Sequence, residues 1–379
     1  MYLRIPNLDY KSIKIMKKYY KISLLLAIFA LFAMKTVSAD ELAFEKGSFN
    51  EVLAKAKAEN KIVMIDFITD WCIWCKHLDM RVYSNSDVVS YASTHQVNWK
   101  TDAEKEGKDL AKQYNVTGFP TLVFVDGDGK EIDKIVGFYP AKDFLEKIKL
   151  INERKSSLTY MQDYYNANKT DLKANLDLAN KLIEAGKTED AKQYLNYIIT
   201  TDAGNSAGYT DDAELNLAML PVEGKAADAS ITEVMALMEK YPGSNLEKDT
   251  KLFLSDKYFE SKNDEKAYVV LSELIKANPD DDMVKFYMGQ YYLGKARKVA
   301  GDSAATADQI NQALKDVDMS VPYFTGGIFE ASAANLKSTL YYKQGDIENS
   351  KKSIDRALEL WADNKTYRKQ YDKVYGNTK

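Results

Sequence analysis

The chemistry that this sequence can perform is concentrated at two cysteines three residues apart. Cys72 and Cys75 follow an apolar run and stand at the start of a segment with helical character. Thiols at this spacing can close a small disulfide ring, and the first lies where free backbone N–H groups and the helix dipole favour negative charge. Such a position lowers a thiol pKa from about 8.5 into the range of about 3.5–7.5. The sequence therefore predicts Cys72 as an attacking thiolate and Cys75 as the thiol that resolves the mixed disulfide.

A carboxyl group lies within the preceding apolar run. Asp66 is costly to bury as an anion in the strand-like segment 61–67, so we interpret it as an acid–base group with a raised pKa. It would take the proton from Cys75 through water; the alternative is a strand-end residue that reaches solvent. Lys76 would add favourable charge near the cysteines. Lys100 either approaches Asp66 or, as we expect, is a surface lysine at a strand end.

Residues 40–152 predict one α/β unit around these groups. A capping box at Ser48 and Glu51 opens a helix that ends near residue 60. The pair of Asp-Gly steps at 126–129 is a hairpin signal, because it separates two strand-like runs. The order is helix, strand, helix, strand, helix, strand, strand, helix, which predicts a central sheet covered by helices. The expected strands after the first are 97–100, 121–125 and 131–136, and the later helices are 105–114 and 141–151.

These motifs resemble the thioredoxin family. Asp66-Phe67, Trp71-Cys72-x-x-Cys75-Lys76 and, about 45 residues later, Gly118-Phe119-Pro120-Thr121 carry the resemblance. The segments 70–76 and 83–88 resemble more narrowly the periplasmic thioredoxin-like domain of the transmembrane thiol–disulfide interchange reductase. The resemblance covers about 113 of the 379 residues and implies a mixed sheet flanked by helices.

The resemblance also implies roles for individual residues. Cys72 would be the nucleophile, Cys75 the resolving thiol and Asp66 the buried acid–base group. Pro120 would be a cis-proline facing the disulfide, and the peptide at Phe119 would pair with an extended substrate strand. We expect no cofactor other than the redox-active disulfide itself.

The residues between the cysteines differ from the usual thioredoxin pattern, since Ile73 and Trp74 replace Gly-Pro. Neither supplies a charge or a hydroxyl to the thiolate, so we expect a reductant rather than a strong oxidant. Trp74 either offers an apolar platform to substrate or packs back on its own domain. Together with Trp71 and Phe119, these two residues form the predicted substrate-binding set.

Other chemistries fit these residues poorly. A zinc site made by the cysteines with His77 and His95 would have a spacing that fits no common zinc finger. Covalent haem needs His directly after Cys75, where Lys76 stands. A calcium loop starting at Asp126 would need Glu at its twelfth position, which is Gly137. We therefore expect no metal, and we place His77 on the exposed face of its helix.

Residues 1–39 predict a secretory signal. Six basic residues within 1–21 precede an apolar run at 22–34 and the small residues of Val37-Ser38-Ala39. Residues 1–15 fit a start-site extension, and the alternative to cleavage is an uncleaved membrane anchor. An exported, periplasmic protein is expected, in a compartment where disulfides form.

Composition limits the classes of partner. Hydrophobic residues make up 45% and charged residues 28% of the chain, as in globular proteins, and 379 residues suggest two or three domains. The formal charge of −4 combines +6 in residues 1–39 with −10 in the remainder. A remainder this acidic is a poor candidate for nonspecific nucleic-acid binding.

Residues 156–379 predict an all-α domain that resembles tetratricopeptide repeats in degenerate form. Five units share a turn residue, a small residue five positions later and a small or apolar residue seven beyond. The turn residues recur every 37–44 residues, against a period of about 34 in regular repeats. The alternative is an irregular α-bundle. The five units are Gly186, Ala191 and Ile198; Lys225, Ser230 and Leu237; Lys262, Ala267 and Leu274; Gly301, Thr306 and Ala313; and Gly345, Ser350 and Ala357.

The expected function is that of an exported protein-disulfide reductase. Its partners would be disulfide-containing protein substrates and an upstream thiol electron donor, which can be membrane-bound. The helical repeats would bind a partner, as such arrays commonly do. The alternative is an interaction protein or scaffold whose repeats act while the thioredoxin domain is a redox-sensitive binding module.

Overall fold

The structure is a computed structural model, and it describes residues 41–221, 224–324 and 327–376. The predicted signal at 1–39 lies outside these residues. Within the described part of the chain, no helix is both long and apolar enough to cross a membrane. The α/β part and the helical array that follows it belong to one compact unit, which starts at Glu41.

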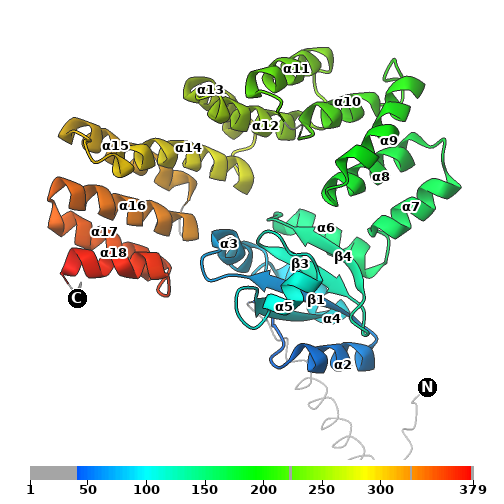
Figure 1. Cartoon of the computed structure of the whole chain (residues 1–379), viewed down its shortest axis with the longest axis horizontal. Coiled ribbons are helices and arrows are strands. Elements are labelled where there is room, and N and C mark those ends of the chain that lie inside the picture. Colours follow the sequence, from blue (N-terminus) through cyan, green and yellow to red (C-terminus); the bar gives the residue numbers. More distant parts are fainter. Residues whose placement is uncertain (1–40, 222–223, 325–326, 377–379) are drawn as a thin grey trace, which may run out of the picture. The chain divides into compact units, whose positions relative to one another are not determined.

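A four-stranded mixed sheet forms the centre of the α/β part (Figure 1). β1 (Ile62–Ile68) pairs in parallel with β2 (Gln96–Asp102) and antiparallel with β3 (Thr121–Val125). β3 also pairs antiparallel with β4 (Glu131–Val136), so the spatial order is β2-β1-β3-β4. The predicted mixed sheet is confirmed, and its central strand is the one that carries Asp66.

Helices cover both faces of this sheet. α2 and α5 pack on the face that carries Ile65 and Phe67. Because successive side chains of a strand point to opposite faces, Asp66 points to the other face, where α3 lies. The helices of this part are α2 (Phe49–Glu59), α3 (Ile73–Arg81), α4 (Ser86–His95), α5 (Lys108–Gln113) and α6 (Ala141–Asn152).

Two local predictions about this part are confirmed. Ser48 and Glu51 form the capping box of α2, with the Ser48 N–H donating to Glu51 Oε2 at 2.7 Å. The hairpin joins β3 and β4, and Asp126 Oδ1 accepts the N–H groups of Asp128 and Lys130 at 3.0 and 2.9 Å. Gly129 completes the turn in the left-handed region, at φ +79°, where a side chain would be strained.

Helix α4 was not among the predicted elements. Its residues include serine, threonine and two valines, which have modest helix propensity, so the sequence pattern is weak. The helix depends instead on its cap and its packing. Asn85 Oδ1 accepts the N–H groups of Asp87 and Val88, and the side chains of Val88 and Ala92 are buried.

The remainder of the described chain is an array of helices (Figure 1). Consecutive helices pack against each other, most extensively α8 with α9, α12 with α13, α14 with α15, and α16 with α17. A short 3-10 helix, η1 (Val321–Tyr323), lies between α15 and α16. The helices are α7 (Leu158–Ala167), α8 (Leu172–Glu184), α9 (Thr188–Thr201), α10 (Thr210–Met219), α11 (Ala227–Lys240), α12 (Glu247–Glu260), α13 (Asp264–Ala277), α14 (Asp282–Gly301), α15 (Ala307–Ser320), α16 (Ile328–Gln344), α17 (Ile347–Leu360) and α18 (Lys365–Tyr375).

The repeat pattern has a structural basis. In α9, α11, α13 and α17 the predicted small residue is the fourth of the helix, and it is buried where neighbouring helices approach closely. These four residues are Ala191, Ser230, Ala267 and Ser350.

The fourth predicted unit is out of register. Thr306 is exposed and is the N-cap of α15, where its side chain accepts the N–H of Gln309. The fourth residue of α15 is Ile310, and Val317 follows seven positions later; both are buried. The prediction is wrong by four residues because Gly301, the predicted turn residue, is the last residue of α14.

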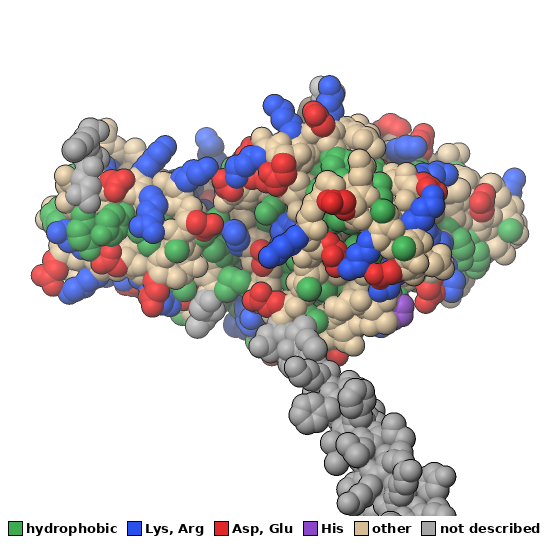
Figure 2. Space-filling view, turned by 90° about the horizontal axis from the view of Figure 1, so that it is seen from below, with side chains coloured by type: hydrophobic (Ala, Val, Ile, Leu, Met, Phe, Trp, Pro, Cys, Tyr) green, Lys and Arg blue, Asp and Glu red, His purple; other side chains and the backbone are tan. Residues whose placement is uncertain are grey.

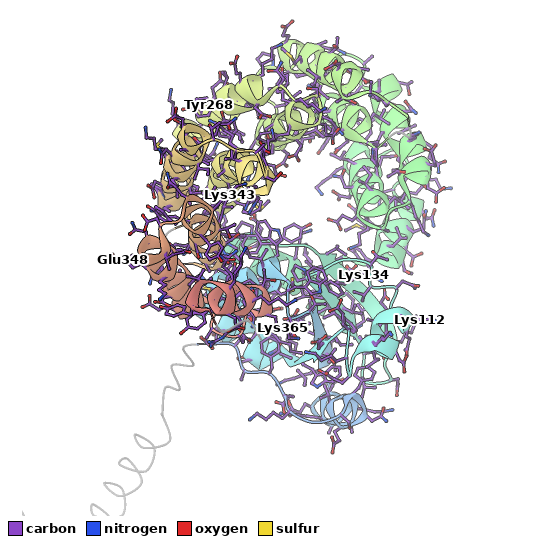
Figure 3. All side chains as sticks on the ribbon, turned by 60° about the vertical axis from the view of Figure 1, so that its left-hand side comes forward. Lys112, Lys134, Tyr268, Lys343, Glu348 and Lys365 are labelled. Atoms are coloured by element: carbon purple, nitrogen blue, oxygen red, sulfur yellow. A yellow bond between two sulfur atoms is a disulfide. The ribbon has the colours of Figure 1, made fainter. Side chains whose placement is uncertain are left out.

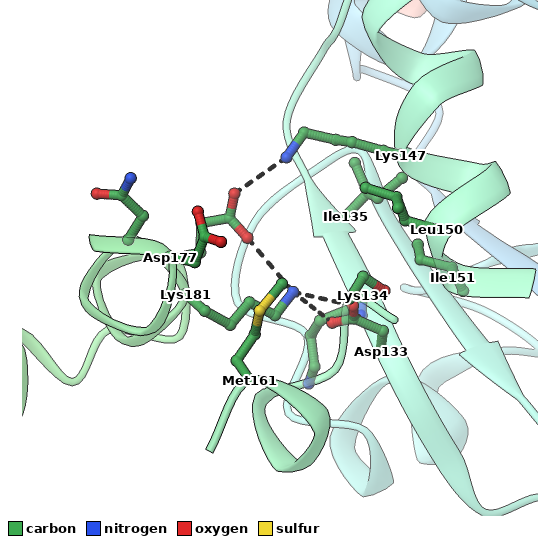
Figure 4. Close-up of a pocket in the computed structure, with 12 residues that line it drawn as sticks. Asp133, Lys134, Ile135, Lys147, Leu150, Ile151, Met161, Asp177 and Lys181 are labelled. Carbon is green, nitrogen blue, oxygen red and sulfur yellow. Dashed lines mark hydrogen bonds and ion pairs between the residues drawn. The ribbon is translucent and has the colours of Figure 1, made fainter. Parts of the chain in front are cut away.

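Both ends of the array contact the α/β part. At the start, Lys181 of α8 pairs with Asp133 of β4 at 2.7 Å, and Lys147 of α6 pairs with Glu184 at 3.0 Å (Figure 4). At the end, Lys365 of α18, labelled in Figure 3, pairs with Asp70 at 2.9 Å. The face shown in Figure 2 carries basic and acidic side chains interspersed, as protein surfaces commonly do.

The buried small residues of the array make a testable prediction. Ala267→Leu should destabilise the protein by about 1–3 kcal/mol, because the added methylenes have no space between packed helices. Ala277→Leu, at the exposed end of the same helix α13, is the matched control and should change stability little. Urea denaturation followed by circular dichroism measures both, and equal effects of the two substitutions would contradict close packing at Ala267.

Candidate functional site

The two cysteines form a disulfide at the N-terminus of α3. Cys72 is the N-cap of this helix and Cys75 lies in its first turn, with their Cα atoms 5.3 Å apart. The N–H of Cys75 donates to Cys72 Sγ at 3.0 Å. The pair is nearly inaccessible, since Cys72 is 3% and Cys75 2% exposed.

This location stabilises negative charge on one sulfur. The first N–H groups of a helix have no partner within the helix, and the helix dipole is positive at this end. The Cys75 N–H already points at Cys72 Sγ, so a thiolate formed there on reduction keeps a hydrogen-bond donor. The geometry therefore favours Cys72, rather than Cys75, as the anionic sulfur.

The predicted proline, Pro120, follows Phe119, whose ring contacts Trp71 directly before Cys72. The Phe119–Pro120 peptide is cis, as predicted, and β3 begins directly after it at Thr121. The rings of Phe119 and Trp71 meet edge-to-face with centroids 5.8 Å apart. Trp71 is 62% exposed, and its Nε1 donates to Glu104 at 3.0 Å. The exposed Trp71, directly before Cys72, is thus in contact with the half-buried Phe119 of the proline loop.

Asp66 is completely buried on the central strand. Burial, opposed by the charge of Lys100, raises the pKa of Asp66 to about 6. Lys100 Nζ lies 3.4 Å from Asp66 Oδ2, which is within ion-pair distance. Neither oxygen of Asp66 has a hydrogen-bond partner of good geometry in the described chain, so the carboxylate is weakly compensated. The predicted burial of Asp66 is confirmed.

Lys100 is not the surface lysine that we expected. It is paired across the parallel strands with Asp66, and its Nζ hydrogen-bonds to Asp79 of α3. Burial lowers the pKa of Lys100, but Asp66 and Asp79 outweigh this effect and raise it. The strand register brings lysine and carboxylate together, and only the pairing of β1 with β2 could have revealed it.

The prediction for His77 was also wrong. His77 is only 8% exposed, and its ring contacts Phe138 and Phe329 with both centroids 4.7 Å away. Burial lowers its pKa to about 4, so the ring is neutral at pH 7. His95 lies on α4 and stacks on Tyr91. The described residues contain no group of three or more metal-ligating side chains.

The two residues between the cysteines face neighbouring parts of the chain. Trp74 contacts Phe138 and His77 of its own domain, which agrees with one of the two alternatives. It also contacts Phe286 and Phe329 of the helical array, and Ile73 packs against the same array cluster. The array contact could not be read from the local sequence.

Two polar residues near Asp66 escaped the sequence analysis. Asp79 lies four residues after Cys75, so it shares a face of α3 with it, and helical spacing could have indicated this. Tyr83 is buried beside Asp66, and burial raises its pKa well above the usual value. Nothing in the local sequence of Tyr83 signals this contact.

Comparison with known proteins agrees with this geometry. A family model for a thioredoxin-like domain matches residues 49–152. The disulfide bond reductase DsbH of Chlamydia pneumoniae is 31% identical over 117 residues, which cover 28% of this chain and 69% of that protein. The chain belongs to the thioredoxin family. Its thioredoxin-like part is of the thiol–disulfide oxidoreductase type.

Other similar proteins match only part of this chain. The thiol:disulfide interchange protein DsbD of Campylobacter jejuni (strain RM1221) is 30% identical over 152 residues, which cover 36% of this chain and 26% of that protein. A tetratricopeptide repeat protein from Parabacteroides merdae aligns with a TM-score of 0.34 at 11% identity, over 62% of this chain and 82% of that one.

The burial of Asp66 predicts a pH dependence of stability. Its pKa in the folded protein, about 6, is above its usual value of 3.8, so the folded state holds a proton that the unfolded state has lost. The free energy of unfolding should therefore fall as pH rises from about 4 to about 6. Asp66→Asn removes this cost and should be more stable than the parent above pH 6, by up to about 3 kcal/mol.

Urea denaturation of the oxidised protein between pH 4 and pH 8 measures the difference. Asp128→Asn, which neutralises an exposed carboxylate of the hairpin, is the control and should follow the parent at every pH. A stability difference between parent and Asp66→Asn that does not grow between pH 4 and pH 6 would contradict the raised pKa.

Proposed function

We propose that the chain is an exported thiol–disulfide oxidoreductase that reduces disulfides in protein substrates. The observation that carries the proposal is the disulfide at the N-terminus of α3, with Cys72 Sγ accepting a helix N–H. The buried Asp66 and the cis Phe119–Pro120 peptide add an acid–base group and a loop next to the cysteine loop. The DsbH relative is itself named as a disulfide bond reductase.

The reaction transfers two electrons from the cysteine pair to the substrate. The Cys72 thiolate attacks one substrate sulfur, a bond forms between them, and the other substrate sulfur leaves as a thiolate. Cys75 then gives its proton through water to Asp66 and attacks Cys72 Sγ. The mixed disulfide breaks, the substrate sulfur that was bonded to Cys72 leaves as a thiolate, and the Cys72–Cys75 disulfide is formed. An upstream dithiol donor, oxidised in turn to a disulfide, must return two electrons to the pair.

The state of Asp66 suits this proton transfer. With a pKa of about 6, the carboxylate is mostly ionised at neutral pH and can accept a proton. Its position on the central strand, facing α3, places it on the same side of the sheet as the cysteine helix. Asp66 thus has the protonation state of a general base for the resolving thiol.

The reductive direction rests on the residues around Cys72. A strong oxidant owes its potential to a stabilised thiolate in the reduced form. Ile73 and Trp74 contribute neither charge nor hydroxyl, so the helix N-terminus is the main source of stabilisation. Export rests on the signal-like order of residues 1–39. The helical array would contribute to partner binding.

Substitution of each cysteine tests the function. Cys72→Ser should lower dithiothreitol-dependent insulin reduction at least about a hundredfold, because no attacking thiolate remains. Cys75→Ser should instead accumulate mixed disulfides with substrate, which non-reducing electrophoresis resolves. The parent protein and Phe253→Ala, which removes a half-buried ring of α12 in a cluster that does not include Trp74, are the controls. Insulin reduction by Cys72→Ser at the parent rate would overturn the proposal.

A further inference from the structure

The helical array contacts Trp74, one of the two residues between the cysteines. The ring of Trp74 lies 4.2 Å from that of Phe286 in α14 and 5.0 Å from that of Phe329 in α16. On its other side it stacks on Phe138, which follows β4, at 5.4 Å. Trp74 is thus held between its own domain and helices that lie more than 200 residues later in the sequence.

This contact is continuous with the core of the array. Phe286 and Phe329 pack on each other at 4.7 Å, and Phe324 packs on Phe329 at 5.5 Å. Phe324 also lies directly against Gly289 of α14, where an added Cβ would come within 2.1 Å of its ring. The aromatic surface that meets Trp74 is therefore supported from behind and is not a loose side-chain contact.

Two ion pairs lie at the margins of the same contact. Arg81, at the end of α3, pairs with Asp282 of α14 at 2.9 Å. Asp70, directly before the Trp71-Cys72 pair, is bonded to Lys365 of α18 at 2.9 Å. Exposed ion pairs contribute little free energy, so their main effect is to fix the orientation of the array on α3.

The consequence is an asymmetric approach to Cys72. The Trp74 flank is covered by the array, whereas on the other flank Trp71 is exposed and Phe119 is half-buried. A single extended segment can lie along the exposed flank, but a folded domain needs space on both flanks. Folded substrates would therefore depend on a minor population in which the array has left Trp74.

We propose that the array is a cover on Trp74 that selects flexible polypeptide disulfides over disulfides in folded proteins. This selectivity rests on the proposed function, but the cover itself does not. The substrate class is a disulfide in an unfolded or loosely folded chain, which reaches Cys72 past Trp71 and Phe119. Release of the array admits larger partners.

Labelling of reduced Cys72 tests the cover independently of any redox activity. Iodoacetamide should alkylate the parent and Phe286→Ala at similar rates, because it is small. A maleimide on a 5 kDa polyethylene glycol should react about tenfold faster with Phe286→Ala, in proportion to the enlarged open population. Phe253→Ala is the matched control: it removes a half-buried ring of α12 that packs in a different cluster.

Charge variants at the Arg81–Asp282 ion pair test the cover even if Phe286→Ala does not fold. Arg81→Glu should raise the rate of bulky labelling, because it places two carboxylates at the Asp282 contact. Adding Asp282→Arg in the same chain should restore the parent rate. Bulky labelling that is as fast in the parent as in Phe286→Ala and Arg81→Glu would overturn the cover.

The selectivity between unfolded and folded substrates is measured with one protein, ribonuclease A, in its scrambled, unfolded state and in its native state. Scrambled, unfolded ribonuclease A should be reduced by the parent and by Phe286→Ala at rates within about twofold, whereas native ribonuclease A should be reduced about tenfold faster by Phe286→Ala. If the ratio of the rate with native to the rate with unfolded ribonuclease A is equal for the parent and for Phe286→Ala, the proposed selectivity is overturned. Failure of the parent to reduce even 5,5′-dithiobis(2-nitrobenzoic acid) would overturn the proposed function and leave the labelling result standing.

Discussion

The chemistry of this protein depends on one hydrogen-bonded sulfur at a helix N-terminus. Cys72 Sγ accepts the N–H of Cys75, in the region where the dipole of α3 favours an anion. The loop that carries Pro120 contacts the residue before Cys72, through the rings of Phe119 and Trp71. A change that moves the start of α3 would therefore alter the reactivity of Cys72 more than a change elsewhere in the domain.

Helix α3 also contacts both the buried charge network and the helical array. Its inner face contributes Asp79 to the network of Asp66 and Lys100, while Trp74 and Arg81 contact the array. Since α3 is held from both sides, the charge state of the buried network and the position of the array act on one element. The array is thus structurally connected to the redox site as well as sequentially attached to it.

Local features of the site could be predicted from the sequence. Short sequence segments are enough to predict the cysteine pair, the capping box at Ser48 and the hairpin at 126–129, because each depends on residues that are close in sequence. The cis peptide before Pro120 could be predicted only from the family resemblance, because no feature of the local sequence indicates it.

Features set by distant contacts could not be predicted. His77 is buried because Phe329, more than 250 residues later, packs on its ring. Lys100 meets Asp66 only through the register of two parallel strands. The error at Thr306 arose from the length of α14, since a helix that continues through glycine gives no clear sign of where it ends.

The reduction potential of the Cys72–Cys75 pair depends on how strongly the N-terminus of α3 stabilises the Cys72 thiolate. Equilibration of the full chain with glutathione or dithiothreitol buffers, followed by quantification of free thiols, measures it. A thiolate stabilised mainly by the α3 N-terminus predicts a reversible couple at about −270 mV, in the range of thioredoxin. A value of about −120 mV, typical of a strong oxidant, or a pair that does not equilibrate with the buffer, would contradict this source of stabilisation.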